Sequence, residues 1–94
     1  MSDIREEIDG TKGRFVITTG EGEAELTFSI LSPGLRIADH TGVPKALEGK
    51  GYAYALVQHL IEDAKAKGYK IVPLCPYVNA QRAKHPEWAE HFSV

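Results

Sequence analysis

The chain has little cysteine, no excess of charge of one sign and no long apolar stretch. Its 94 residues contain one Cys, and the formal net charge is −2. A single Cys excludes an intramolecular disulfide, and a slightly acidic chain without a basic run offers no positive surface for nucleic acid or an anionic membrane. No apolar segment approaches the roughly 20 residues that cross a bilayer. The segment 1–7 lacks the apolar core of a signal peptide, so we expect a cytoplasmic protein.

The length leaves room for one hydrophobic core. A chain of 94 residues should bury roughly 60 to 65 % of the surface that its unfolded form exposes. We therefore expect a single domain over residues 1–94, and a monomer.

The N-terminal half predicts an antiparallel meander. The expected strands, separated by turns rich in Gly or containing Pro, are 4–8, 14–19, 26–30 and 35–40. In the fourth strand, alternation of side chains predicts that His40 shares a face with Arg36 and Ala38, and that Asp39 lies on the other face.

An amphipathic helix is predicted from about Tyr52 to Lys67. Its apolar residues follow one helical stripe: Ala53, Leu56, Val57, Leu60, Ile61 and Ala64. Gly68 should end the helix. The strand expected at 69–74 would then run parallel to strand 35–40, because a helical crossover returns the chain in the same direction. A short helical tail follows.

The segment Glu48–Ala53, just before this helix, has the features of an anion site. The first backbone N–H groups of a helix lack intrahelical partners, its dipole favours an anion, and glycines let oxygens approach closely. A Walker A loop is excluded because Gly51 follows Lys50, where Ser or Thr would bind magnesium. A dinucleotide fingerprint is excluded because Tyr54 occupies the position of its third Gly.

A shorter pattern remains: Gln or Arg, two residues, Gly, one residue, Gly or Ala. Gly51 and Ala53 fit this pattern, which resembles the pyrophosphate loop of the GNAT superfamily of N-acetyltransferases. Three further blocks support the resemblance to small GNAT-like proteins of the YjdJ type: His40–Pro44, Val72–Val78 and Lys84–Ala89. The resemblance covers the C-terminal half, and the departures from the family pattern are Gly42, Glu48, Tyr52 and Tyr54.

The resemblance implies a minimal GNAT fold of the α+β class, with antiparallel N-terminal strands, a parallel β-α-β crossover around the cofactor loop and short C-terminal helices. It implies acetyl-coenzyme A as cofactor, with the pantetheine arm lying along strand 35–40. The residues expected to bind it are Val43, Gly49, Lys50, Gly51, Tyr52, Ala53, Tyr77 and Asn79.

Cys75 and His40 are the catalytic candidates. A lone Cys can be an inert buried side chain, a nucleophile that carries the acetyl group, or an acid that protonates the departing thiolate. His40 can act as the base that deprotonates an amine, or merely cap the strand. No pair of ligands has the spacing of a zinc site, so we expect no metal.

These features predict an acetyl-coenzyme A-dependent N-acetyltransferase acting on an amine, either a protein lysine or a small amine. The alternative is a non-catalytic acyl-coenzyme A sensor or interaction module that kept the loop without the chemistry. A third possibility is a purely structural domain without a ligand.

Overall fold

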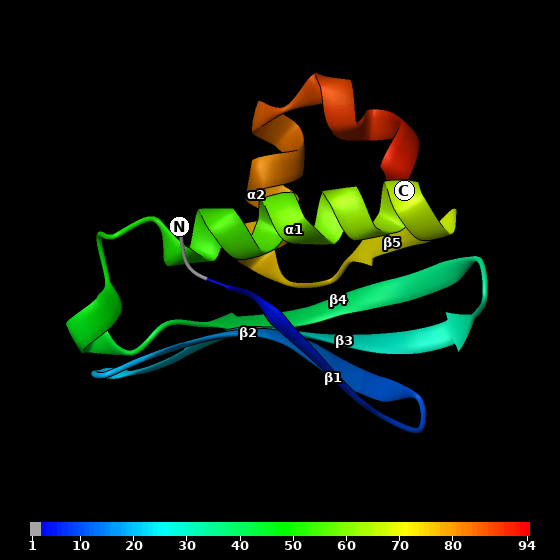
Figure 1. Cartoon of the computed structure of the whole chain (residues 1–94). Helices are drawn as coiled ribbons and strands as arrows, with labels where there is room; N and C mark the ends of the chain where they lie inside the picture. Colours follow the sequence, from blue (N-terminus) through cyan, green and yellow to red (C-terminus); the bar gives the residue numbers. More distant parts are fainter. Residues whose placement is uncertain (1–2) are drawn as a thin grey trace.

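A computed structural model describes residues 3–94 and contains a sheet of five strands with the helices on one face (Figure 1). The strands are β1 (Arg5–Asp9), β2 (Lys12–Thr19), β3 (Gly22–Ser32), β4 (Leu35–Gly42) and β5 (Lys70–Pro73). Their spatial order follows the sequence; β1 to β4 pair antiparallel, and β5 pairs parallel to β4. We call the face of the sheet under the helices the inner face, and the opposite one the outer face.

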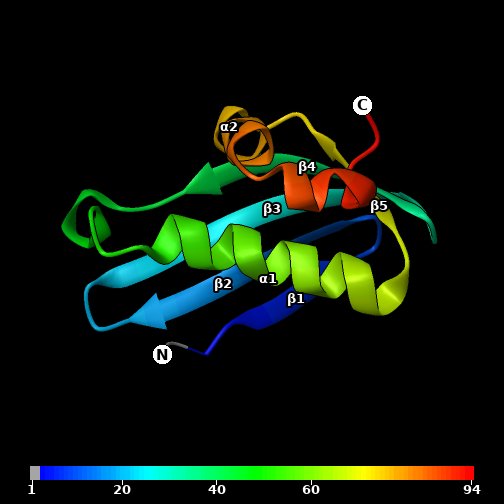
Figure 2. The same ribbon diagram turned by 90° about the horizontal axis from the view of Figure 1, so that it is seen from above.

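The helical elements follow the predicted order. They are η1 (Lys45–Leu47), α1 (Tyr52–Lys67), α2 (Pro76–Lys84) and η2 (Pro86–His91). Figure 2 shows α1 lying across the sheet, with α2 on one side of it and β1 on the other. Gly68 ends α1 in the left-handed conformation, with φ of 77°, and its N–H donates to the carbonyl of Ala64 at 2.8 Å. The predicted α+β fold with one parallel crossover is confirmed.

The core lies between α1 and the inner face. The predicted apolar stripe of the helix is buried at Leu56, Val57, Leu60, Ile61 and Ala64. The sheet contributes Phe15 and Phe28, whose ring centroids are 4.9 Å apart. The C-terminal segment closes the sheet, because Phe92 is buried and forms a parallel bridge to Ile71 of β5.

A buried arginine fixes the C-terminal half of α1 on the sheet. The guanidinium of Arg36 lies over the rings of Phe28 and Tyr69, at 4.9 and 4.2 Å from their centroids. Its Nη1 is 3.6 Å from Glu6 and 3.5 Å from Asp63 of α1. Cation–π contacts and carboxylates together compensate a charge that would be costly to bury alone. The helix is therefore held to both β1 and β4 at this end.

A bulge in β4 changes the predicted phase of the strand. Thr27 pairs with His40, whereas the next residue of β3 pairs with Ala38, so Asp39 is an extra residue on β4. Ala38 is buried and His40 is exposed. The prediction that these two side chains share a face is wrong, because the extra residue shifts every later side chain by one position. Thr41 takes the inward position instead, opposite Leu26 of the core.

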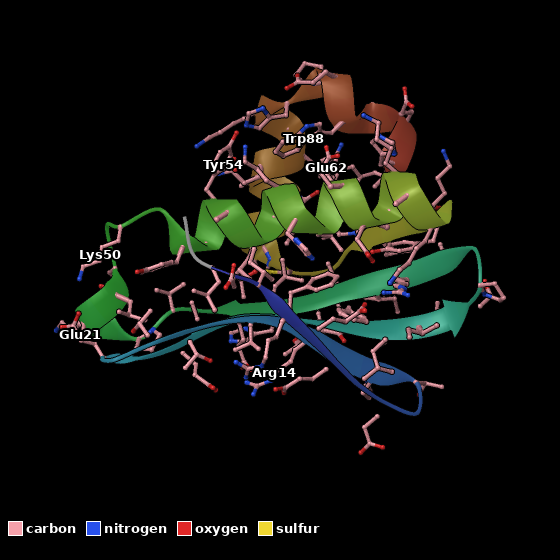
Figure 3. All side chains as sticks on the ribbon, in the orientation of Figure 1. Arg14, Glu21, Lys50, Tyr54, Glu62 and Trp88 are labelled. Carbon is pink, nitrogen blue, oxygen red and sulfur yellow. The ribbon has the colours of Figure 1, made fainter. Side chains whose placement is uncertain are left out.

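The outer face of the sheet is covered by charged side chains rather than by a helix. Arg14, which points away from α1 in Figure 3, contacts Glu7 at 2.7 Å, Glu25 at 2.8 Å and Glu23 at 3.3 Å. The hydrogen bond from Arg14 is the main reason that the pKa of Glu7 is lowered. No helix in the part of the chain that the structure describes is long and apolar enough to cross a membrane.

We predict that Gly13→Ala destabilises the fold by about 1–3 kcal/mol, the usual cost of overpacking. A Cβ at Gly13 would lie 2.6 Å from Cζ of Phe28 and 3.0 Å from the carbonyl oxygen of Glu7. The ring is fully buried in the core. The measurement is the free energy of unfolding in urea. Gly20→Ala is the matched control, since a Cβ there meets no atom within 4 Å; equal losses in the two variants would contradict the packing argument.

Candidate functional site

The loop before α1 presents open backbone at the N-terminus of a helix. Gly49 and Gly51 have φ of 77° and 81°, and a Cβ at either would meet no atom within 4 Å. The first helical hydrogen bond runs from Ala55 N–H to the Gly51 carbonyl at 3.0 Å, so the N–H groups of residues 52–54 have no acceptor within the helix. The first turn contains no acidic residue. These features together favour an anion at this point.

A cavity of about 230 Å³ adjoins this loop. It is lined by Val43, Leu47, Glu48, Gly49, Gly51, Tyr52, Ala53, Tyr54 and Tyr77. Six of the eight residues predicted to bind the cofactor thus meet around one space, from the end of β4 to the first turn of α2. Leu47 is buried and anchors η1 beneath the loop.

The other two predicted residues, Lys50 and Asn79, are not in this lining. The Nζ of Lys50 is 3.3 Å from Glu21 in the turn between β2 and β3, as Figure 3 shows at the loop end of the molecule. Asn79 is exposed on α2, and its side-chain oxygen accepts a hydrogen bond from Arg82 at 3.0 Å. Their roles in binding stay predictions.

β4 and β5 separate next to the cavity. Their pairing ends at Ala38 and Pro73, and the N–H of Cys75 then donates to the Ala38 carbonyl at 2.8 Å. β4 continues to Gly42, and no described strand pairs with it on the β5 side beyond Ala38. Its free backbone groups there can bind an extended ligand as an added strand would.

Cys75 lies where the two strands part. It is 2 % exposed and is the N-cap residue of α2. Its Sγ is 3.3 Å from Oγ1 of Thr41, and either atom can be the donor. Thr41 was not predicted from the sequence. The bulge alone turns it inward, and simple alternation contains no signal for a bulge.

His40 lies on the other face of β4. It is exposed, and a Cβ added at Gly42 would be 3.3 Å from its Nε2, so the ring lies against the strand backbone. On this outer face a cavity of about 560 Å³ reaches Asp39, Thr27 and Arg14. The two catalytic candidates are therefore separated by the strand, and their roles stay predictions.

Aromatic side chains border the cavity on the side of α2. Tyr54, which Figure 3 shows near Trp88, stacks on it with ring centroids 6.3 Å apart. His85 also stacks on Trp88, with centroids 4.1 Å apart. Burial, together with the nearby Tyr54, raises the pKa of Tyr77. Tyr77 is therefore a neutral hydroxyl at physiological pH, able to donate a hydrogen bond into the cavity.

Comparison with known proteins identifies the family. Residues 14–91 match the model of the GCN5-related N-acetyl-transferase family. The chain belongs to this family. Its members are acyltransferases, which confirms the resemblance and the enzyme class predicted from the sequence. No curated protein matches the chain at a significant level.

A solved structure shows the same fold. The solution NMR structure of a GCN5-like protein from Staphylococcus aureus superimposes with a TM-score of 0.69 at 22 % sequence identity, and the match covers 99 % of this chain and 91 % of that one. The predicted minimal GNAT fold is confirmed by this likeness.

We predict a decline in stability above pH 10 that depends on Tyr77. Its folded-state pKa is raised, whereas the unfolded chain loses the same proton near pH 10. The native state then binds more protons than the unfolded state, so the contribution is fully present below about pH 10 and is lost as the pH rises further. Urea unfolding from pH 8 to 11 should show a steeper loss for the wild type than for Tyr77→Phe. Parallel curves would show that the pKa is not raised.

Proposed function

We propose that this chain binds acetyl-coenzyme A and transfers its acetyl group to an amine. One observation carries the proposal: the open loop at Gly49 and Gly51 adjoins a cavity that extends to Val43, the residue directly after β4, whose edge beyond Ala38 is free. An anion site followed in space by a free strand edge suits a ligand in which a pyrophosphate is followed by an amide-containing arm.

In the proposed complex, the pyrophosphate binds the N–H groups of Gly51, Tyr52 and Ala53. The pantetheine arm leaves past Val43 and Tyr77 and pairs with the backbone of β4. The thioester then lies near Thr41 and Cys75. Gly49 and Gly51 matter because a side chain at either would project into the open space that the phosphate oxygens need.

In the proposed reaction, the amine loses a proton and its nitrogen attacks the thioester carbonyl carbon. The carbon–sulfur bond breaks, and the departing thiolate takes up a proton. Cys75 is the proposed acid for this last step, and His40 the proposed base for the amine. Thr41, in contact with Cys75 at 3.3 Å, can donate a hydrogen bond to the Cys75 thiolate that remains after this step. The acceptor is a protein lysine or a small amine.

The second candidate function is an acyl-coenzyme A sensor without turnover. Two observations favour it. The Cys75 thiol is 2 % exposed, and His40 lies on the face of β4 opposite Thr41. A chain with this arrangement could bind the thioester and present it without a base on the same face.

We predict that acetyl-coenzyme A binds one-to-one in calorimetric titration, and that Gly51→Glu abolishes the heat. The added carboxylate would enter the anion site at the positive end of α1. Gly68→Glu is the matched control, because Gly68 has φ of 77° against 81° at Gly51 and also has open space around it. The backbone strain is thus similar, but Gly68 is at the other end of the helix. Equal loss of binding in both variants, or no heat with the wild type, would refute the site.

We also predict that Cys75→Ala and His40→Ala lower kcat by about 10²-fold or more, the usual contribution of a general acid or base, without changing the Kd for acetyl-coenzyme A. Release of free thiol should be followed with a panel of amines, including a lysine peptide. His91→Ala is the control for loss of an imidazole outside the site. Binding without turnover on every amine would favour the sensor over the enzyme.

A further inference from the structure

Ser29 of β3 is a buried hydroxyl that bridges two charged side chains of the neighbouring strands. It is 8 % exposed. Nζ of Lys12 in β2 donates to its Oγ at 2.7 Å, and this Oγ donates to Oδ2 of Asp39 in β4, also at 2.7 Å. Because an ammonium group only donates and a carboxylate only accepts, the single hydroxyl proton is directed at Asp39. Both distances are those of charge-assisted hydrogen bonds.

The bridge ends on the residue that makes the bulge in β4. Ser29 pairs with Ile37, and Asp39, two residues later, is the extra residue of the strand. The hydrogen bond therefore ties the bulge to the regular part of the ladder between β3 and β4. An extra residue leaves the ladder locally unpaired, and a buried hydroxyl without its acceptor is costly as well. The bridge and the bulge thus stabilise each other.

A second hydroxyl of β3 holds the residue after the bulge. Oγ1 of Thr27 donates to the carbonyl oxygen of His40 at 3.3 Å, and the two residues are partners in the ladder. Side chains of β3 therefore contact both residues at which β4 changes phase, Asp39 and His40.

The bulge decides which side chain of β4 faces Cys75. With the bulge, Leu26 pairs with Thr41, and Oγ1 of Thr41 is 3.3 Å from Sγ of Cys75. Without an extra residue, the pairing after Phe28 would move by one position, and Leu26 would lie opposite His40. The imidazole would then take the inward position beside the thiol, and Thr41 would point outward.

We propose that Ser29 and Lys12 are positioning residues that hold this bulge through Asp39. The bulge in turn keeps the hydroxyl of Thr41 beside the thiol of Cys75. The consequence for catalysis rests on the proposed function, in which Thr41 donates a hydrogen bond to the Cys75 thiolate. The consequence for the register of β4 does not depend on it.

Nuclear Overhauser contacts read the register in the folded protein. The wild type should show a contact between backbone protons of Leu26 and Thr41, and one between the side chains of Thr41 and Cys75. In Ser29→Ala both should weaken at least twofold, and a contact from Leu26 to His40 should appear. Lys12→Met should change the same contacts in the same direction. Urea midpoints check that each variant is folded.

Conservative and matched variants separate positioning from general stability. Asp39→Asn keeps a side-chain oxygen that accepts from Ser29, so it should preserve the wild-type contacts, whereas Asp39→Leu should lose them. Thr18→Ala is the matched control, because the Thr18 hydroxyl also bridges a basic and an acidic side chain, those of Arg5 and Glu23. This variant should leave the register of β4 unchanged.

Kinetics test whether Ser29 acts through Thr41. At saturating acetyl-coenzyme A, Ser29→Ala should lower kcat about tenfold, as expected for loss of one hydrogen bond to a charged group. Thr41→Val should cause a similar loss, and the double variant no further one, because both changes remove the same contact. Additive losses would overturn the route through Thr41.

The outcomes separate this inference from the proposed function. Unchanged register contacts in folded Ser29→Ala and Lys12→Met would overturn the inference, whatever the activity of these variants. If the wild type acetylates no amine but the contacts change in Ser29→Ala, the proposed function fails and the role of Ser29 in holding the bulge stands. Should Ser29→Ala not fold, Lys12→Met decides, since Lys12 is exposed.

Discussion

The hydrogen bond from the Cys75 N–H to the Ala38 carbonyl marks the point on which the site depends. It is the last backbone contact between the two chain segments before β4 and β5 diverge. Pro73 has no N–H and Pro76 begins α2, so the chain after β5 cannot continue the ladder and turns away as a helix. This separation leaves the edge of β4 free and places the Cys75 thiol where the strands part. It also lets α2 bring Tyr77 to the cavity beside the loop.

The opposite end of α1 determines where its N-terminus points. Arg36, between Phe28 and Tyr69 and near Glu6 and Asp63, joins the last turns of the helix to β1 and β4. The apolar stripe fixes which face of the helix is buried, but apolar packing is non-directional and does not by itself fix its position along the sheet. A charged side chain with several specific partners does, so the geometry of the loop before α1 depends on contacts made at the other end of the helix.

The regular patterns in the sequence predicted the helix and the loop before it, but they did not predict the bulge in β4. Helical periodicity placed α1 from Tyr52 to Lys67, and the glycine spacing placed the open loop before it, because both depend on local backbone preferences. Alternation placed His40 on the same face as Ala38, and it failed at Asp39 because one inserted residue leaves no trace in the sequence pattern. Thr41 was missed for the same reason. Lys50 lies outside the first cavity because its partner, Glu21, is brought near only by the tertiary fold.

The two glycines at the ends of α1 share a backbone conformation but differ in what it does for the helix. Both residues have a left-handed backbone, with φ of 81° and 77°. At Gly68 this conformation has a structural use, because its N–H satisfies the carbonyl of Ala64. At Gly51, by contrast, no side chain lies over the first turn of α1. Neither a capping side chain nor an acidic residue accepts hydrogen bonds from the N–H groups there. A helix optimised for stability alone would carry Ser, Thr, Asp or Asn at this position. The absence of a capping side chain at Gly51 is explained if a bound anion supplies the missing hydrogen-bond acceptors.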